Sequence, residues 1–216
     1  MKKKALIIGS SRGIGRSILK SVEKLNYEII NPSRKELDTS KINSILKFIK
    51  TLKKIDVLIL NTGGPPAKEF FQITDQEWNK YYNQLFLGFV KILQLIKINK
   101  EGYIFAITSH TIKKPENNLV LSNSFRVAFS SVFKTYSKLV SDKKISCVNI
   151  APGPIKTDRL KQLVKNLKSF EKKLPMKYAA DPDEIGYFVQ SILKNKIKYL
   201  NGVTINFDGG LSDFIF

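Results

Sequence analysis

The sequence predicts a single α/β domain over residues 1–216, with a doubly wound parallel sheet of about seven strands. Two observations predict this fold class. Short, uninterrupted apolar runs alternate with longer segments in which apolar residues recur at helical spacing, as in sheets covered by helices on both faces. No linker, repeat or low-complexity segment divides the chain, and its 216 residues are typical of one domain.

The clearest strands are six short apolar runs. They cover residues 5–8, 28–30, 56–60, 103–107, 145–150 and 203–207. Helices are expected from about residue 14, over 42–52, through 78–96, over 121–140, in a charged region over 158–172, and from residue 182. Parallel strands need long crossover connections, which are usually helices, so this order favours a βαβ series.

The strong positive charge raises the question of a polyanionic partner. The chain has 37 Lys+Arg against 18 Asp+Glu, a formal net charge of +19. Only five of the basic residues are arginine, and the lysines are spread along the whole chain. Nucleic-acid readers favour the bidentate guanidinium fork. We therefore interpret the charge as a lysine-rich solvated surface and expect no nucleic-acid partner; weak attraction to polyanions is the alternative.

Hydropathy and cysteine content indicate the compartment. No apolar run reaches the roughly 18 residues of a membrane-spanning helix, and the run after the first lysines is too short for a signal peptide. The single cysteine, Cys147, has no partner for an internal disulfide. We expect a cytoplasmic protein without a membrane partner. No Cys/His cluster has zinc spacing, so no metal site is expected.

Three glycines follow the first predicted strand and precede the first helix. Gly9, Gly13 and Gly15 have G-x-x-x-G-x-G spacing. A pyrophosphate binds best where free backbone N–H groups meet a helix N-terminus and no side chain blocks close approach. The alternative is an ordinary tight turn. We interpret this segment as a dinucleotide site, with these candidate cofactor residues: Gly9, Ser11, Arg12, Gly13, Ile14 and Gly15.

The residues after the second predicted strand bear on the choice of cofactor. An acidic residue there would hold the ribose 2′-hydroxyl of NAD, whereas a basic residue accommodates the 2′-phosphate of NADP. Residues 31–35 contain no acid, and Arg34 lies among them. Arg12 adds a second guanidinium, whose fork geometry matches phosphate. We therefore favour NADP(H), with NAD(H) as the alternative if Arg34 is merely solvated.

Four further motifs follow in order along the chain. They are Asn61-Thr-Gly63-Gly64, Thr108-Ser109, the stretch 149–157 containing Pro152-Gly153, and the stretch 202–210. Together with the glycine spacing they resemble the short-chain dehydrogenase/reductase family over essentially the whole chain. The resemblance implies a Rossmann fold, a homodimer or homotetramer, and cofactor contacts from these residues: Asn61, Gly63, Pro152, Gly153, Ile155 and Thr157.

The resemblance also implies that Asp38 contacts the adenine ring. The span from Gly15 to Asp38 is short for the family. We infer that the usual helix between the family's second and third strands is trimmed.

The family's catalytic pattern is only partly present. Its serine is matched by Ser109, but its tyrosine and lysine positions are occupied by Ser122 and Arg126, and its helix asparagine by Leu85. Chains with serine and arginine at these positions resemble atypical 3-oxoacyl-carrier-protein reductases. A serine hydroxyl is far less acidic than a phenol, and Arg126 cannot release a proton. Loss of a general acid costs about 10²–10⁴ in rate.

Three functions follow as hypotheses, of which the weakest is a nucleic-acid-associated protein that binds through its positive charge. The first is an NADP(H)-dependent oxidoreductase that interconverts a small carbonyl and an alcohol, with Ser109, Ser122 and Arg126 as catalytic residues. The second is a dinucleotide-binding protein of the same fold that has lost catalysis and acts as a sensor or subunit. His110 is either a substitute proton donor or a surface imidazole.

A basic segment follows the Pro-Gly motif. Residues 158–177 resemble the family's substrate lid and contain Arg159 and six lysines. This charge either attracts an anionic or carrier-bound substrate or forms a solvated helix face.

Overall fold

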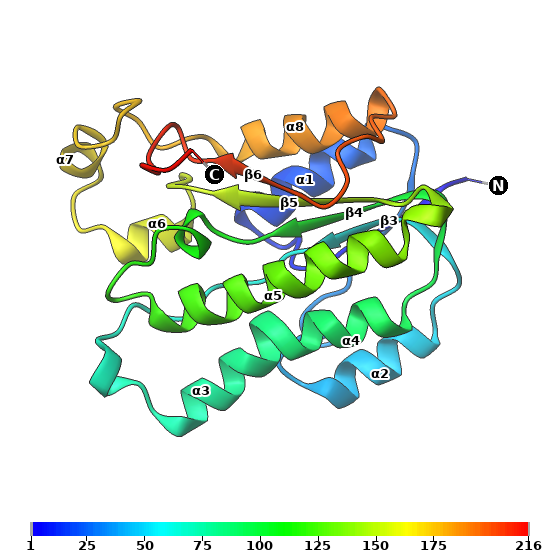
Figure 1. Ribbon diagram of the computed structural model, residues 1–216, viewed down its shortest axis with the longest axis horizontal. Coiled ribbons are helices and arrows are strands. Elements are labelled where there is room, and N and C mark those ends of the chain that lie inside the picture. The colour runs from blue at the N-terminus through cyan, green and yellow to red at the C-terminus, as the bar shows by residue number, and fades with distance from the viewer. Residues whose placement is uncertain (1, 216) are drawn as a thin grey trace.

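A computed structural model describes residues 2–215. Its strands form one parallel sheet in the order β2-β1-β3-β4-β5-β6 (Figure 1). The strands are β1 (Lys4–Ile7), β2 (Glu28–Ile30), β3 (Ile55–Leu60), β4 (Ile98–Ile107), β5 (Ser146–Pro152) and β6 (Val203–Phe207). The predicted α/β class with a doubly wound parallel sheet is confirmed.

Helices connect the strands. The α-helices are α1 (Gly13–Glu23), α2 (Ile42–Lys50), α3 (Asp75–Tyr82), α4 (Gly88–Leu95), α5 (Val120–Leu139), α6 (Asp158–Leu163), α7 (Leu167–Glu171) and α8 (Pro182–Lys194). The short 3-10 helices are η1 (Phe70–Gln72), η3 (His110–Ile112) and η4 (Ser141–Lys143), and η2 (Asn83–Leu87) is a π-helix. Within residues 2–215, no helix combines the length and the apolar composition needed to cross a membrane.

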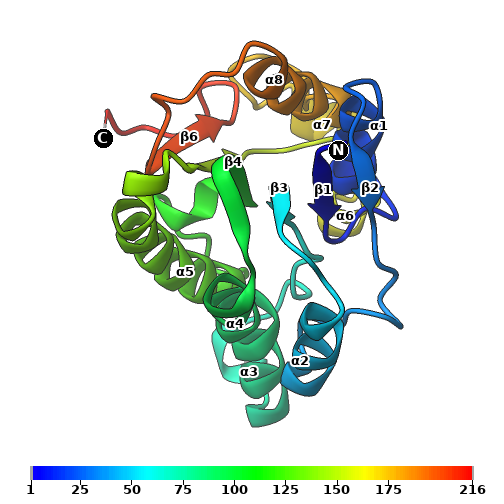
Figure 2. The same cartoon turned by 90° about the vertical axis from the view of Figure 1, so that its right-hand side faces the viewer.

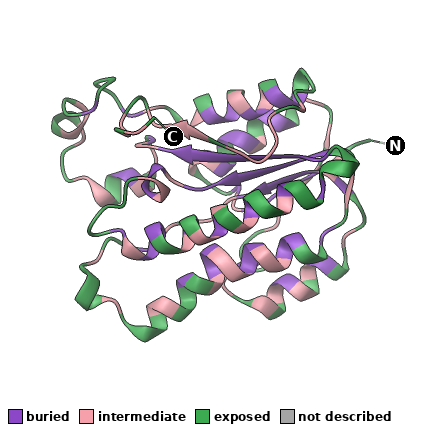
Figure 3. Cartoon of the chain, in the orientation of Figure 1, coloured by how far each residue is buried: buried purple, intermediate pink, exposed green. Residues whose placement is uncertain are grey.

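The sheet lies between two helical layers (Figure 2). Helices α1 and α8 cover one face, where Ile7 packs with Ile18 and Ile185. Helices α2, α4 and α5 cover the other face. Successive strand residues point to opposite faces, and both faces are buried. This explains why the strands are continuous in apolar residues (Figure 3).

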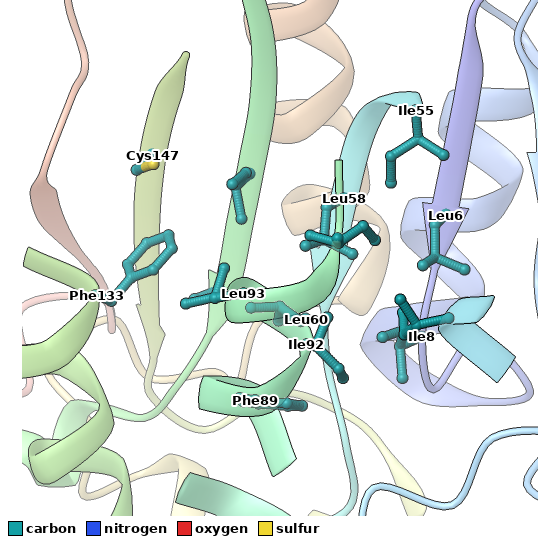
Figure 4. Close-up of a cluster of buried hydrophobic side chains, with 14 of the residues drawn as sticks. Leu6, Ile8, Ile55, Leu58, Leu60, Phe89, Ile92, Leu93, Phe133 and Cys147 are labelled. Carbon is teal, nitrogen blue, oxygen red and sulfur yellow. The ribbon is translucent and has the colours of Figure 1, made fainter. Parts of the chain in front are cut away.

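The core between the sheet and α4 shows this packing directly. Four side chains project toward Phe89 of α4 (Figure 4): Leu6 from β1, Ile8 from the residue after it, and Leu58 and Leu60 from β3. All five side chains are almost completely buried. Such burial contributes roughly 1.5–3 kcal/mol per large side chain. This packing fixes the strand ends that carry the candidate site.

The sheet has six strands, not about seven as predicted. Residues 31–41 run from β2 to α2 as turns and extended chain, without a helix or a strand. Only one large apolar side chain in this segment, Leu37, is buried in the core. An additional strand in this sheet would need several apolar residues facing the core. Residues 31–41 supply only one, so they do not form such a strand. The predicted loss of the helix between the family's second and third strands is therefore confirmed. Residues 31–41 also lack the strand that would have lain outside β2 in the sheet.

The long helix predicted over residues 78–96 is interrupted. The π-helix η2 joins α3 to α4, and Gly88 begins α4. A Cβ on Gly88 would lie 2.3 Å from the carbonyl oxygen of Thr39, so only glycine allows the turn before α2 to pack here. π-Helical turns are rare and are often found at functional sites.

The predicted motifs meet at one edge of the sheet. Parallel strands end on the same side, so Gly9, Asn61 and Ser109 follow the carboxyl ends of β1, β3 and β4. From β1 the chain proceeds outward to β2 and then returns to the other side of β1 as β3. Ligands of open α/β sheets bind where the strand order reverses in this way. A ligand site is therefore expected around the carboxyl ends of β1, β3 and β4.

Candidate active site

The glycine turn, residues 9–15, is shaped by two close approaches. Gly9 has a φ of +68°, a conformation that favours glycine. A Cβ on Gly15 would lie 2.0 Å from the carbonyl oxygen of Gly9, which excludes any side chain there. The side-chain amide of Asn61 donates a hydrogen bond to the same oxygen at 2.9 Å. The end of β3 is thereby tied to the turn after β1.

The first turn of α1 has no side-chain cap. Arg12 is the N-cap residue and makes no capping hydrogen bond, so the first N–H groups of the helix lack side-chain partners. Ser11 and Arg12 are exposed, and Ile14 is half-buried. Backbone N–H groups at the start of a helix, beside a turn without side chains, match the needs of a pyrophosphate. The residues present fit a dinucleotide.

The Pro-Gly segment, residues 152–157, lies opposite this turn. A Cβ on Gly13 would be 3.1 Å from the Thr157 methyl carbon. The N–H of Gly153 donates to Phe207 at 2.9 Å, and Ile155 is buried and pairs with Ala180. The structure therefore brings Gly13 and Thr157, which are far apart in the sequence, close together.

Gln84 is a residue of this site that sequence analysis missed. Its Nε2 donates to the carbonyl oxygen of Gly63 at 2.7 Å and lies 3.3 Å from the Thr62 hydroxyl. Leu85, which the resemblance places at the family's asparagine position, is instead buried against Leu121. The sequence contained no signal for this role, because Gln84 lies in the π-helix and α-helical spacing does not predict its orientation.

The turn after β2 joins two predicted cofactor residues. The Arg34 Nε pairs with the Asp38 carboxylate at 3.3 Å, and the Arg34 side chain is 71% exposed. Asp38 also accepts hydrogen bonds from the N–H and hydroxyl of Ser40. Partial burial alone would raise the pKa of Asp38, but the hydrogen bonds from Ser40 and the charge of Arg34 lower it. Asp38 thus organises the turn before α2.

A carboxylate lies closer to this turn than the sequence suggested. Residues 31–35 contain no acid, but Glu36 folds back and accepts a hydrogen bond from the Ser33 N–H at 2.7 Å. This hydrogen bond lowers the pKa of Glu36. The residues at the end of β2 therefore present both charges, and Arg34 and Glu36 are both exposed.

The predicted catalytic residues come from the end of β4 and the start of α5. Ser109 is half-buried, and its hydroxyl oxygen lies 3.1 Å from the Thr111 hydroxyl. Ser122 is buried one helical turn before Arg126. The guanidinium of Arg126 donates to the carbonyl oxygen of Ile107 at 2.8 Å. Because Ile107 lies two residues before Ser109, this bond links α5 to the strand end that carries Ser109.

Arg126 is a buried cation. Burial and, to a smaller extent, the charge of Arg159 together lower its pKa to about 10. Within residues 2–215, neither Arg126 nor Arg159 forms an ion pair. Arginine nevertheless remains protonated in proteins, so Arg126 stabilises negative charge and does not donate a proton.

His110 is not a surface imidazole. It is 9% exposed, and its Nδ1 lies 3.1 Å from the Pro152 carbonyl oxygen. Its Nε2 lies 3.0 Å from the Glu116 carboxylate. Because both ring nitrogens are directed at protein acceptors, His110 holds the Pro-Gly segment against the loop before α5. Groups of three or more His, Cys, Asp or Glu that could hold a metal are absent from residues 2–215.

Known proteins are similar to this chain in sequence. A family model described as enoyl-(acyl carrier protein) reductase matches residues 16–212. The chain is 26% identical over 238 residues to the 3-oxoacyl-(acyl-carrier-protein) reductase FabG of Buchnera aphidicola subsp. Baizongia pistaciae, covering 97% of each protein.

Solved structures share the fold. YwfH, described as an NADPH-dependent reductase involved in bacilysin biosynthesis, gives a TM-score of 0.89 at 20% identity and covers 100% of both chains. L-sorbose reductase from Gluconobacter frateurii, solved with NADPH and L-sorbose, gives a TM-score of 0.86 at 20% identity. That match covers 99% of this chain and 98% of the reductase. From the family model, which spans most of the chain, we conclude that this protein belongs to the short-chain dehydrogenase/reductase family and is distantly similar to FabG reductases.

Proposed function

We propose that the protein is an NADP(H)-dependent oxidoreductase that interconverts a small carbonyl compound and an alcohol. The observation that carries this proposal is the glycine turn closed by Asn61 beside an α1 without a side-chain cap. Thr157 faces this turn from the other side. The end of β4, which carries Ser109, lies only one strand beyond the end of β3, which carries Asn61. A dinucleotide bound at the turn would therefore have the polar side chain of Ser109 near its nicotinamide end.

The site residues have separate roles in this proposal. When bound, NADPH supplies the hydride that adds to the carbonyl carbon, a proton adds to the oxygen, and the cofactor is left oxidised. The hydroxyls of Ser109 and Ser122 donate hydrogen bonds to the carbonyl oxygen. Arg126 stabilises the negative charge that develops on it, and such stabilisation is often the largest contribution to catalysis. The proton comes through a hydroxyl or from water, because the guanidinium does not release one.

NADP(H) is the cofactor that we favour. Related structures were solved with NADPH, among them L-sorbose reductase. In this chain, Arg12 and Arg34 would face a 2′-phosphate. The Arg34–Asp38 pair is largely exposed on the arginine side, and exposed pairs contribute only about 0–1 kcal/mol. A phosphate dianion can therefore compete for the Arg34 guanidinium.

A second candidate function rests on one observation. Ser122, which the resemblance places at the position of the family's phenol, is buried, and Arg126 is placed at the position of its ammonium. In this alternative the chain binds the dinucleotide without turning over a substrate and acts as a sensor or subunit.

Calorimetry and kinetics separate these functions. We expect NADPH to bind more tightly than NADH. We also expect turnover of at least one member of a panel of ketones, aldehydes and carrier-linked 3-oxoacyl thioesters. Ser109→Ala should then reduce kcat by at least about tenfold while NADPH binding is kept. Binding without turnover of any substrate would favour the second candidate, and no binding of either nucleotide would refute both.

We further propose that the chain assembles as a homodimer or homotetramer. The outer surface of α5 exposes Val127 and Leu139, and nearby Tyr82 of α3 is also exposed. Apolar side chains on neighbouring helices suit a contact between identical subunits. Light scattering coupled to gel filtration tests this, and a monomer at micromolar concentration would contradict it.

A further inference from the structure

Two arginines near the proposed reaction centre have no acidic partner. Arg126 is 7% exposed and makes one side-chain hydrogen bond within residues 2–215, to the Ile107 carbonyl oxygen. A guanidinium has five N–H donors, so most of those of Arg126 have no protein acceptor. Arg159, at the start of α6, is half-buried and is not part of an ion pair among the described residues.

Arg159 reaches from α6 across to the turn after β3. A Cβ on Gly64 would lie 3.5 Å from its Nε. Strand β3 neighbours β4, to whose end Arg126 is hydrogen-bonded, so the two guanidinium groups lie at adjacent strand ends. The charge of Arg159 accordingly contributes, after burial, to the lowered pKa of Arg126. Two positive charges thus lie close together in a partly buried region without a compensating carboxylate. Buried charges are normally paired, and an uncompensated one is strongly destabilising. An anionic ligand would relieve this cost.

The phosphates of the cofactor do not account for the uncompensated charge of Arg126. The pyrophosphate is expected at the glycine turn, which follows β1, whereas Arg126 is hydrogen-bonded at the end of β4. Strand β3 lies between them. With neighbouring strands about 4.8 Å apart, the two positions are separated by roughly 10 Å along the sheet edge. The end of β4 is instead where Ser109 would meet the substrate.

We propose that the substrate is an oxo acid, a carbonyl compound whose carboxylate pairs with Arg159 while Arg126 adds a second positive charge beside Ser109 and Ser122. This inference rests on the proposed oxidoreductase function and narrows its substrate class. A guanidinium binds a planar carboxylate through two parallel hydrogen bonds, which also orients the attached carbonyl. The exposed lysines of the lid, such as Lys161 and Lys165, contribute only long-range attraction.

Paired substrates test the proposal. Pyruvate, benzoylformate and 4-oxopentanoate are each compared with their methyl ester, which keeps the carbonyl and removes the charge. With NADPH as cofactor, kcat/KM should be at least about 30-fold higher for one or more acids than for the matching ester. Arg159→Gln should abolish most of this preference by lowering activity on the acid, and Arg159→Lys should restore part of it.

The matched control is Lys161→Gln. It removes one positive charge from the same helix at an exposed position and should leave the acid-to-ester ratio unchanged within about twofold. If Lys161→Gln lowers the ratio as much as Arg159→Gln, general charge rather than the Arg159 contact selects the substrate, and the proposal is wrong.

A binding measurement gives a readout without turnover. Calorimetry with and without NADPH should show that benzoate binds to the wild-type protein. Benzamide added to the wild-type protein should give no heat, and neither should benzoate added to the Arg159→Gln variant. If NADPH does not bind but benzoate still binds through Arg159, the oxidoreductase proposal fails and the anion site stands.

The opposite result is also distinguishable. If NADPH binds and esters react as well as acids, the substrate class is wrong while the oxidoreductase proposal stands. If Arg159→Gln weakens NADPH binding as much as benzoate binding, Arg159 serves the cofactor phosphates and the proposal is overturned.

Discussion

The side-chain amide of Asn61 donates a hydrogen bond to the carbonyl oxygen of Gly9 at 2.9 Å. This single bond fixes the end of β3 against the turn that follows β1, across the point where the strand order reverses. The same carbonyl oxygen lies against Gly15 in the first turn of α1, beside the N–H groups where an anion is expected. The proposed cofactor site therefore depends on two segments that are 52 residues apart in sequence.

The Asn61–Gly9 bond can be tested by changing its donor. Asn61→Ala should lower the free energy of unfolding by about 1–2 kcal/mol, because the carbonyl loses its partner. Asn61→Asp should be worse, because a carboxylate cannot donate and would repel both the Gly9 oxygen and a pyrophosphate. Urea unfolding and NADPH calorimetry measure both effects. The control is Asn79→Asp on the exposed side of α3, which adds the same charge and should change neither. Equal stability of Asn61→Asp and wild type would contradict this role.

Two glycines should respond differently to alanine. At Gly15 a Cβ would lie 2.0 Å from the Gly9 carbonyl oxygen, whereas nothing lies within 4 Å of a Cβ at Gly63. Gly15→Ala should destabilise the protein by about 1–3 kcal/mol, even though alanine favours a helix over glycine by about 1 kcal/mol. Gly63→Ala should keep the wild-type Tm but weaken NADPH binding, since the added methyl group occupies space that the cofactor would need. Unchanged NADPH affinity in Gly63→Ala would argue against a cofactor contact there.

Gln84 is expected to position the turn containing Gly63. Gln84→Ala removes the 2.7 Å hydrogen bond to the Gly63 carbonyl oxygen and should raise the Kd for NADPH by about 5–30-fold. Gln84→Glu keeps the size of the side chain but loses the donor, so it should weaken binding at least as much. Gln94→Ala, at an exposed position of α4, is the control. If both alanine variants bind NADPH like wild type, Gln84 has only a packing role.

Arg34 should distinguish the two nicotinamide cofactors. Arg34→Ala should raise the Kd for NADPH by about tenfold, because a charge-assisted contact to the 2′-phosphate is lost. The Kd for NADH should stay within about twofold. Removing the exposed charge of Lys20 on α1 provides the control for general electrostatics. Equal changes for both cofactors would place Arg34 outside the phosphate site.

Stability at alkaline pH should depend on Cys147. This side chain is completely buried in β5, and burial raises its pKa from 9.0 to about 12. Between these values the unfolded thiol loses its proton while the folded thiol keeps it, so the unfolded state binds fewer protons and stability falls as pH rises. The stabilising contribution is fully present below pH 9 and is lost toward pH 12.

Urea unfolding at pH 7, 9 and 10 measures this effect. Cys147→Ala lacks the thiol and should lose less stability over that range, by up to about 1.4 kcal/mol per pH unit. Tyr103, whose pKa burial also raises to about 12, will leave a residual slope in the variant. The same alkaline slope in wild type and Cys147→Ala would show that the thiol does not contribute.

Parts of the fold could be predicted because they depend on local patterns. The apolar runs that became β1 and β3 needed only hydropathy, since both faces of the sheet are buried. The glycine spacing identified a turn with close backbone approach, and the structure shows that approach at Gly15. The absence of the outer strand was not predicted. The resemblance implies the complete sheet of the family, whereas this shortened chain lacks one of its strands.

The contacts within the site could not be predicted in the same way. Gln84 depends on a π-helical turn, and His110 depends on acceptors from Pro152 and Glu116 that only folding brings together. Arg159 appeared in the sequence as one basic residue among many in the segment 158–177.

The sequence by itself determined the class of fold, the order of its strands along the chain and the place of the glycine turn, because these follow from hydrophobic periodicity and from glycine spacing. The tertiary structure decided the number of strands, the partner of the Gly9 carbonyl, and the placing of Arg126 and Arg159 at neighbouring strand ends. Such long-range contacts arise from packing between distant segments, and packing leaves no periodic signal in the chain.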